Sequence, residues 1–161
     1  MLNRAAVENA RKYFTSQGYP QVKQEIAGRQ LEYFLLPQSL EPSLPRFAMA
    51  VVSEDRRHHV FGVADTVPES YRPFWALHEH VEFLEEPEGP DKCRRALDKE
   101  LGAVPAEAMT DYQAVRLQFF RDLITYTKTH SENSDPKDLA QTVAKYQKSL
   151  SRLEELAAKS T

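Results

Sequence analysis

The chain of 161 residues is long enough for one compact domain with an appendage and too short for two large ones. Its 21 basic and 24 acidic residues leave a formal charge of −3, so it lacks the positive field that binds nucleic acid or an anionic membrane surface. A single cysteine excludes an internal disulfide, and no stretch approaches the ~20 apolar residues of a membrane span. We therefore expect a cytoplasmic protein without a signal peptide.

The first predicted element is a helix over residues 3–17. Ala6, Ala10 and Phe14 recur there at helical spacing, and Gly18 ends the pattern.

Two β-hairpins are predicted next. Residues 22–26 and 31–36 flank an Ala-Gly turn, and the proline-containing residues 39–45 then form a loop. The apolar run 47–52 and residues 59–63 flank a polar, charged turn. We expect the four strands to form a small antiparallel sheet.

Helices account for most of the remaining chain. Residues 71–86 form a helix that follows a capping threonine and a proline, and residues 87–90 close it. Helices over 91–101 and 105–130 follow, the second with an apolar face. The predicted fold class is α+β, with the small sheet backed by helix 71–86 and covered by further C-terminal helices.

The predicted organisation is one α+β domain over residues 1–130, followed by a linker and an amphipathic helix over 131–161. The last helix carries a narrow apolar seam with four- and three-residue spacing, made by Leu139, Val143, Tyr146, Leu150 and Leu153. Such a seam either docks on the domain or pairs with a partner helix, for instance in a homodimer.

The pattern His-Glu-x-x-Glu, at His78, Glu79 and Glu82, is the main chemical signal in the chain. Residues four apart lie on one helical face, so His78 and Glu82 can approach one cation from the same side. The neighbouring Glu79 can then reach a water molecule at that cation. Trp75 lies on the same side, as expected at the wall of a cleft.

Residues 74–83, Phe-Trp-Ala-Leu-His-Glu-His-Val-Glu-Phe, resemble the active-site helix of zincin-like metallopeptidases, especially the minimal ImmA/IrrE-like type. Residues 93–101, followed by Pro105, are similar to the segment that supplies the third ligand in that family. The resemblance covers about residues 47–105. It departs from the family at Glu82, where the family has histidine, and at Cys93, where it has glutamate.

This resemblance implies a metal-dependent hydrolase that acts on a peptide bond. His78, Glu82 and Cys93 would ligate zinc or another divalent cation, and Glu79 would act as the general base. A peptide substrate would add a strand to the edge of the sheet. His80 would not take part, because a residue two positions on from His78 points to the other side of the helix.

A second interpretation is a non-catalytic regulatory or adaptor domain that has lost the metal and binds a protein partner through its C-terminal helix. In that case Glu79 and Glu82 are solvated, and His78 bonds a backbone carbonyl. The other histidines favour structural roles: His58 and His59 lie at the surface of a strand, and His130 caps a long helix.

Overall fold

The computed structural model describes residues 3–85 and 88–159. Its first helix, α1 (Arg4–Ser16), confirms the prediction for residues 3–17. Asn3 caps the helix by accepting a hydrogen bond from the backbone N–H of Ala6 at 3.0 Å. Gly18 follows the helix in the left-handed region, at a φ of 75°, where glycine carries no steric penalty.

Both predicted hairpins are present in a four-stranded sheet with the order β1-β2-β4-β3. The strands are β1 (Gln21–Ile26), β2 (Arg29–Leu36), β3 (Ala48–Val52) and β4 (His59–Ala64). β1 pairs with β2 and β3 with β4 in antiparallel fashion, whereas β2 and β4 are parallel. The sheet is therefore mixed, and the prediction of a wholly antiparallel sheet was wrong in this respect.

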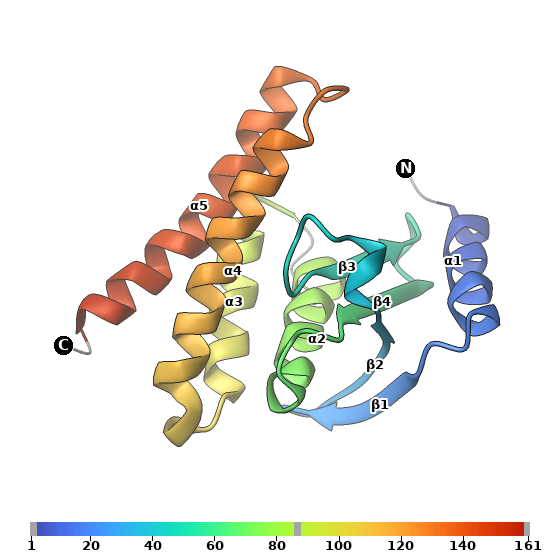
Figure 1. Ribbon diagram of the computed structural model, residues 1–161, viewed down its shortest axis with the longest axis horizontal. Coiled ribbons are helices and arrows are strands. Elements are labelled where there is room, and N and C mark those ends of the chain that lie inside the picture. Colours follow the sequence, from blue (N-terminus) through green and yellow to red (C-terminus); the bar gives the residue numbers. More distant parts are fainter. Residues whose placement is uncertain (1–2, 86–87, 160–161) are drawn as a thin grey trace.

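The composition of the second hairpin explains this order. β4 is almost entirely buried, which suits a central strand covered on both faces, while every residue of β3 is only half-buried. After β2, the chain passes through η1 (Gln38–Leu40) and does not return to pair directly with β2. The strand that pairs with β2 is β4, and β3 therefore lies at the edge of the sheet. In Figure 1 the sheet lies between α1 and α2 (Arg72–His80).

The predicted helix 71–86 is present as three consecutive parts. Residue 86 lies outside the described residues. A 3-10 turn, η2 (Glu69–Tyr71), leads into α2, and the π-helical turn η3 (Val81–Glu85) continues it. A π turn contains an extra residue, so it shifts the side chains after His80 relative to an ideal α-helix. This turn carries Glu82.

The C-terminal half is a layer of helices against α2 (Figure 1). Its elements are α3 (Lys92–Ala103), η4 (Ala106–Ala108), α4 (Met109–Thr129) and α5 (Pro136–Lys159). α5 packs on α3 and α4, and its seam residues Leu150 and Leu153 are buried. The seam thus docks within the chain, while a homodimer through this helix stays a prediction.

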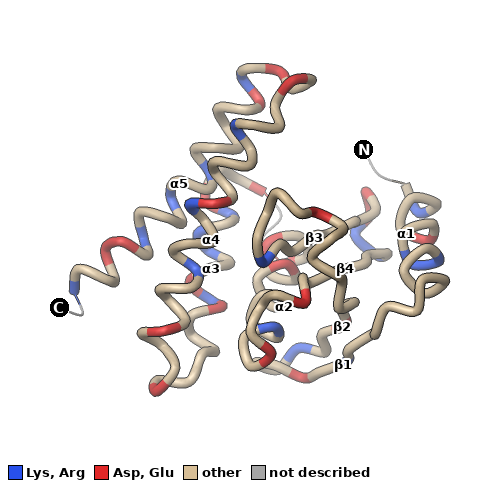
Figure 2. The backbone as a smooth tube through the Cα atoms, viewed as in Figure 1, with Lys and Arg blue, Asp and Glu red and all other residues tan. Residues whose placement is uncertain are grey.

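Acidic and basic residues are mixed along the helices, whereas β3 and β4 carry neither (Figure 2). Within residues 3–85 and 88–159, none of the helices has the length and apolar character needed to cross a membrane.

Gly62 sets the spacing of the central strand. A Cβ atom there would meet Leu36 Cδ1 at 2.3 Å and Met49 Cγ at 3.1 Å, whereas a Cβ at Gly102, within α3, would meet nothing within 4 Å. We expect Gly62→Ala to lower the free energy of unfolding by about 1–3 kcal/mol through overpacking. Gly102→Ala, the matched control, should raise it by up to about 1 kcal/mol. Urea denaturation measures both, and equal effects would contradict the close approach at Gly62.

Candidate metal centre

Three predicted ligands come together in the interior. His78 lies in the last turn of α2, Glu82 in η3 and Cys93 in the first turn of α3, with exposed fractions of 3%, 4% and 1%. His78 Nε2 is 3.5 Å from Glu82 Oε2 and 3.6 Å from Cys93 Sγ, and one ligand atom from each residue lies within 4.8 Å of the others. The three side chains could therefore hold a metal ion.

The two separations measured from His78 Nε2 fit a tetrahedral ion. With usual zinc–ligand lengths, tetrahedral angles require about 3.4 Å between a nitrogen and an oxygen ligand and about 3.6 Å between a nitrogen and a sulfur ligand. The observed separations are 3.5 and 3.6 Å. Imidazole, carboxylate and thiolate are also the donor types that zinc uses, and three protein ligands leave a fourth position for water or substrate.

The other ring nitrogen of His78 is held by a buried carboxylate. His78 Nδ1 donates to Glu100 Oε1 at 2.7 Å, and the carboxylate also accepts bonds from Arg116 at 2.6 and 2.9 Å and from the hydroxyl of Tyr112. The Arg116 guanidinium stacks on the Trp75 ring, 3.8 Å from its centroid. A carboxylate bound to Nδ1 fixes the tautomer of the ring and orients Nε2 toward Glu82 and Cys93. Carboxylates have the same role beside metal-binding histidines.

The electrostatics of this cluster favour ionised carboxylates. Burial opposes ionisation of Glu100, but the Arg116 charge and the hydrogen bond from His78 outweigh it and lower its pKa to about 2. Burial likewise opposes ionisation of Glu82, yet the hydrogen bond and charge of His78, with Lys145, lower its pKa to about 2. Burial also disfavours the His78 imidazolium, but Cys93, Glu100 and Glu82 together raise the pKa of His78 well above its usual value.

Glu79 lines the same cavity as the three donors. This cavity has a volume of about 140 Å³, and residues of β3, including Ala48 and Ala50, form part of its wall. Burial, together with the negative charge of Glu82, raises the pKa of the Glu79 carboxyl to about 7. A carboxyl group that exchanges its proton near neutral pH suits the predicted role of Glu79 as a general base.

Two further side chains reach the cluster from α5, which the sequence had separated from the domain. Lys145 Nζ lies 3.4 Å from Glu82 Oε1, and the Ser149 hydroxyl donates to Cys93 Sγ at 3.2 Å. Ser149 is fully buried.

Sequence reasoning missed four residues of the site: Glu100, Arg116, Lys145 and Ser149. Two of them had left a signal. Glu100 and Arg116 each interrupt the apolar face of a helix, and a charged residue in such a stripe must find a buried partner. Lys145 and Ser149 carry no comparable signal, since a lysine and a serine are ordinary residues beside a helical seam.

The remaining predicted neighbours have other roles. Trp75 is fully buried, donates from Nε1 to the Arg46 carbonyl at 3.1 Å, and supports the site through Arg116. His80 points away, as predicted, and pairs with Glu85 at 3.2 Å. His130 stacks on Tyr126 at the end of α4, with ring centroids 4.1 Å apart.

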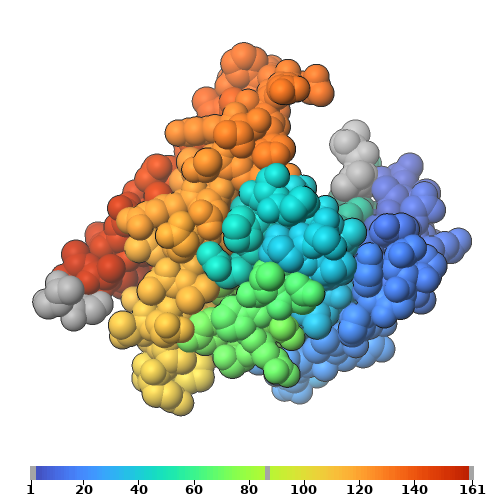
Figure 3. All heavy atoms as spheres, in the orientation of Figure 1, coloured from blue at the N-terminus to red at the C-terminus, as the bar shows by residue number. Residues whose placement is uncertain are grey.

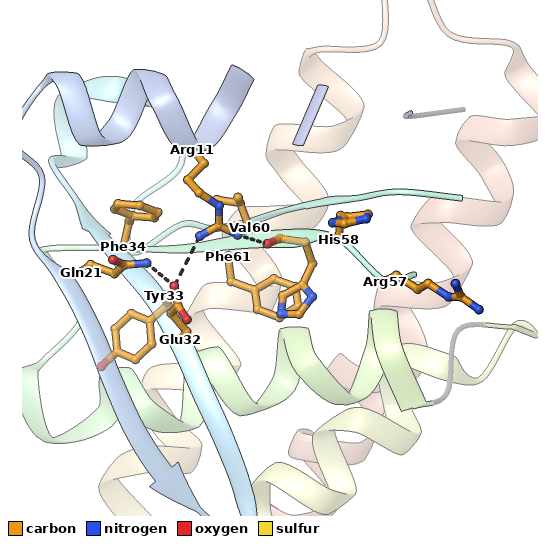
Figure 4. A pocket seen from close by; sticks show the side chains of 10 residues that line it. Arg11, Gln21, Glu32, Tyr33, Phe34, Arg57, His58, Val60 and Phe61 are labelled. Atoms are coloured by element: carbon orange, nitrogen blue, oxygen red, sulfur yellow. Dashed lines mark hydrogen bonds and ion pairs between the residues drawn. The ribbon is translucent and has the colours of Figure 1, made fainter. Parts of the chain in front are cut away.

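His58 and His59 line a separate cavity of about 140 Å³ between α1 and the sheet (Figure 4). Two of its charged groups are paired, because Arg11 donates to Glu32 at 3.3 Å, and Arg11 also donates to the His59 carbonyl at 2.8 Å. Figure 4 shows Arg57 pointing away from these groups. This cavity offers no comparable set of metal ligands.

Comparison of the chain with models of known protein families, with curated proteins and with solved structures finds no match. The case for a function therefore depends on the geometry and chemistry of the site.

The Glu100 carboxylate makes a testable contribution to stability. Glu100→Gln should cost about 3 kcal/mol or more, because it leaves Arg116 buried without a counter-charge. The pKa of Glu100 is about 2 in the folded chain and ordinarily about 4.5, so its ionisation stabilises the fold above pH 4.5 and this contribution is lost as the pH falls toward 2.

Chemical denaturation at several pH values measures this contribution. Between pH 4.5 and 2, the slope of unfolding free energy against pH should be smaller in Glu100→Gln than in the wild type. The difference should correspond to the uptake of about one proton fewer on unfolding. Equal slopes in the two proteins would show that folding does not lower the pKa of Glu100.

Proposed function

We propose that this chain is a metal-dependent hydrolase that acts on a peptide bond, with His78, Glu82 and Cys93 as ligands of a divalent cation and Glu79 as the general base. One observation carries the proposal: three buried donors lie within 4.8 Å of one another, with His78 Nε2 at 3.5 and 3.6 Å from the other two, while Glu100 accepts a hydrogen bond from the other ring nitrogen of the histidine.

The cation, when bound, would supply a Lewis acid that polarises the scissile carbonyl and makes a water molecule more acidic. Glu79 would accept the proton of that water and pass it to the leaving amine. Its position one residue after His78 places it beside the donors without making it one of them, and its carboxyl group borders the same cavity.

The edge of the sheet supports a peptide as the substrate. Among the strands of the described residues, β3 pairs only with β4, so its outer side can add an extended chain through backbone hydrogen bonds. Ala48 and Ala50 of β3 border the cavity that holds Glu79. A peptide lying along β3 would therefore pass the donors. α4 and the segment around β3 lie against each other on the face shown in Figure 3, and residues of both elements line the cavity.

Zinc is the ion that the donor set favours. An imidazole and a thiolate select zinc over magnesium or calcium, which take oxygen ligands, although the Glu82 carboxylate widens the range toward manganese. The zincin-like family has a second histidine in place of Glu82. An additional anionic ligand reduces the net positive charge of the centre, and this would weaken its pull on a carbonyl oxygen.

Elemental analysis of chain purified without chelator tests the proposal directly. We expect about one equivalent of zinc or another divalent cation, reduced to background in His78→Ala. Glu79→Gln should keep the metal and lose peptide hydrolysis. Protein without metal that also fails to bind added zinc would discard the proposal and leave the non-catalytic regulatory domain as the alternative.

Metal binding should also release protons. The raised pKa of His78 leaves its imidazole protonated near pH 7 in the metal-free chain, and this proton must leave before Nε2 can bind the ion. Affinity for zinc should therefore rise with pH. Calorimetric titrations in buffers of different ionisation enthalpy should show release of at least one proton for each zinc, and a heat independent of the buffer would contradict the assignment of His78.

A further inference from the structure

Each of the three candidate ligands is contacted from behind by a polar side chain. Glu100 of α3 accepts a hydrogen bond from His78, Lys145 forms an ion pair with Glu82, and Ser149 donates a hydrogen bond to Cys93. The last two come from α5, one helical turn apart and on the same face of that helix. The helix therefore contacts both Glu82 and Cys93.

We propose that Lys145 and Ser149 are positioning residues of the metal centre, so that α5 is an integral part of the site. The inference rests on the proposed function, because it assigns these contacts to a metal-bound state. Their role is to orient the Glu82 carboxylate and the Cys93 sulfur toward the metal ion that His78 Nε2 would bind.

Ser149 acts on the sulfur. Its hydroxyl donates to Cys93 Sγ at 3.2 Å and is fully buried, so it cannot exchange this bond for one with solvent. A hydrogen bond to a thiolate ligand removes electron density from the sulfur and fixes its direction. Alanine at this position would leave the sulfur with one neighbour fewer and little change in packing volume.

Lys145 acts on the carboxylate. Its ammonium lies 3.4 Å from Glu82 Oε1, whereas Oε2 is the oxygen that faces His78 Nε2. The lysine and the ion would therefore use different oxygens of one carboxylate. Apart from this ion pair, Oε1 is buried and accepts no hydrogen bond from the described residues. Removing the ammonium would leave that oxygen uncompensated and the carboxylate free to rotate away from His78.

The opposite effect is also physically conceivable, since an ammonium repels a divalent cation and could compete for Glu82. The two effects differ in sign. If Lys145 positions Glu82, its removal weakens metal binding; if it competes with the ion, its removal strengthens metal binding. The use of separate oxygens favours the first, and the measurement of affinity decides.

The experiment compares Ser149→Ala and Lys145→Met with two controls on α5, Ser151→Ala and Lys148→Met. Ser151 is exposed, and Lys148 pairs with Asp91 at 2.7 Å outside the site. Zinc affinity is measured by competition with a chromogenic chelator, and circular dichroism confirms that each full-length variant is folded. We expect each site variant to bind zinc about 10–100-fold more weakly, as is typical for residues that support ligands. The controls should stay within about twofold of the wild type.

Cobalt substitution separates positioning from a general effect on folding. In the cobalt-loaded chain, the sulfur-to-metal charge-transfer band should shift in Ser149→Ala and stay in place in Lys145→Met, because of these two residues it is Ser149 that donates to the sulfur. Lys145→Arg should recover part of the affinity that Lys145→Met loses.

The outcomes distinguish this inference from the proposed function. Wild-type chain that binds metal, with site variants that match the controls in affinity and spectrum, would overturn the positioning roles alone. Tighter binding by Lys145→Met would overturn the role of Lys145 and identify it as a competitor of the ion. A wild-type chain that binds neither zinc nor cobalt would overturn the proposed function and this inference together.

Discussion

The bonds to the Glu100 carboxylate connect three helices. This group accepts hydrogen bonds from His78 of α2 and from Tyr112 and Arg116 of α4, while its own helix is α3. A buried charge is tolerated only where such partners satisfy it, so the carboxylate fixes how the three helices meet. The same bonds determine which ring nitrogen of His78 faces the cavity. The position of the candidate centre thus follows from a requirement of the folded core.

Around this core, four elements contribute to one point. α2 and η3 bring His78 and Glu82, α3 brings Cys93, and α5 brings the two side chains that contact the anionic ligands. The edge strand β3 borders the cavity from the side of the sheet. Basic side chains do approach the cluster, yet Arg116 is bound to Glu100, and Lys145 meets only the outer oxygen of Glu82. The cavity that the three donors line is otherwise bounded mainly by apolar and aromatic side chains, among them Phe119, Phe120 and Tyr146.

Local patterns in the sequence predicted much of this architecture. The α1 helix, the two hairpins, the motif helix and the C-terminal helices all follow from spacing and from turn residues, and the proximity of the candidate ligands His78 and Glu82 follows from helical geometry. Cys93 was placed by resemblance alone, and the structure brings it beside them.

The features that could not be predicted from the sequence depend mainly on contacts between distant segments. The parallel pairing of β2 with β4 depends on which strand is buried on both faces, and local alternation does not reveal this. The division at residue 130 separated Lys145 and Ser149 from the ligands that they contact, because a polar linker looks the same whether or not the helix after it packs back on the domain. The π turn at Val81–Glu85 likewise leaves no pattern in the residues.

The central claim is that His78, Glu82 and Cys93 bind one cation. Anomalous diffraction at the zinc edge, from crystals of the whole chain grown with zinc and without chelator, tests it most directly. The account predicts a peak about 2.0–2.3 Å from His78 Nε2, Glu82 Oε2 and Cys93 Sγ, with Nδ1 still bound to Glu100. A map with no peak at this position, or with the three side chains turned away from one another, would contradict it.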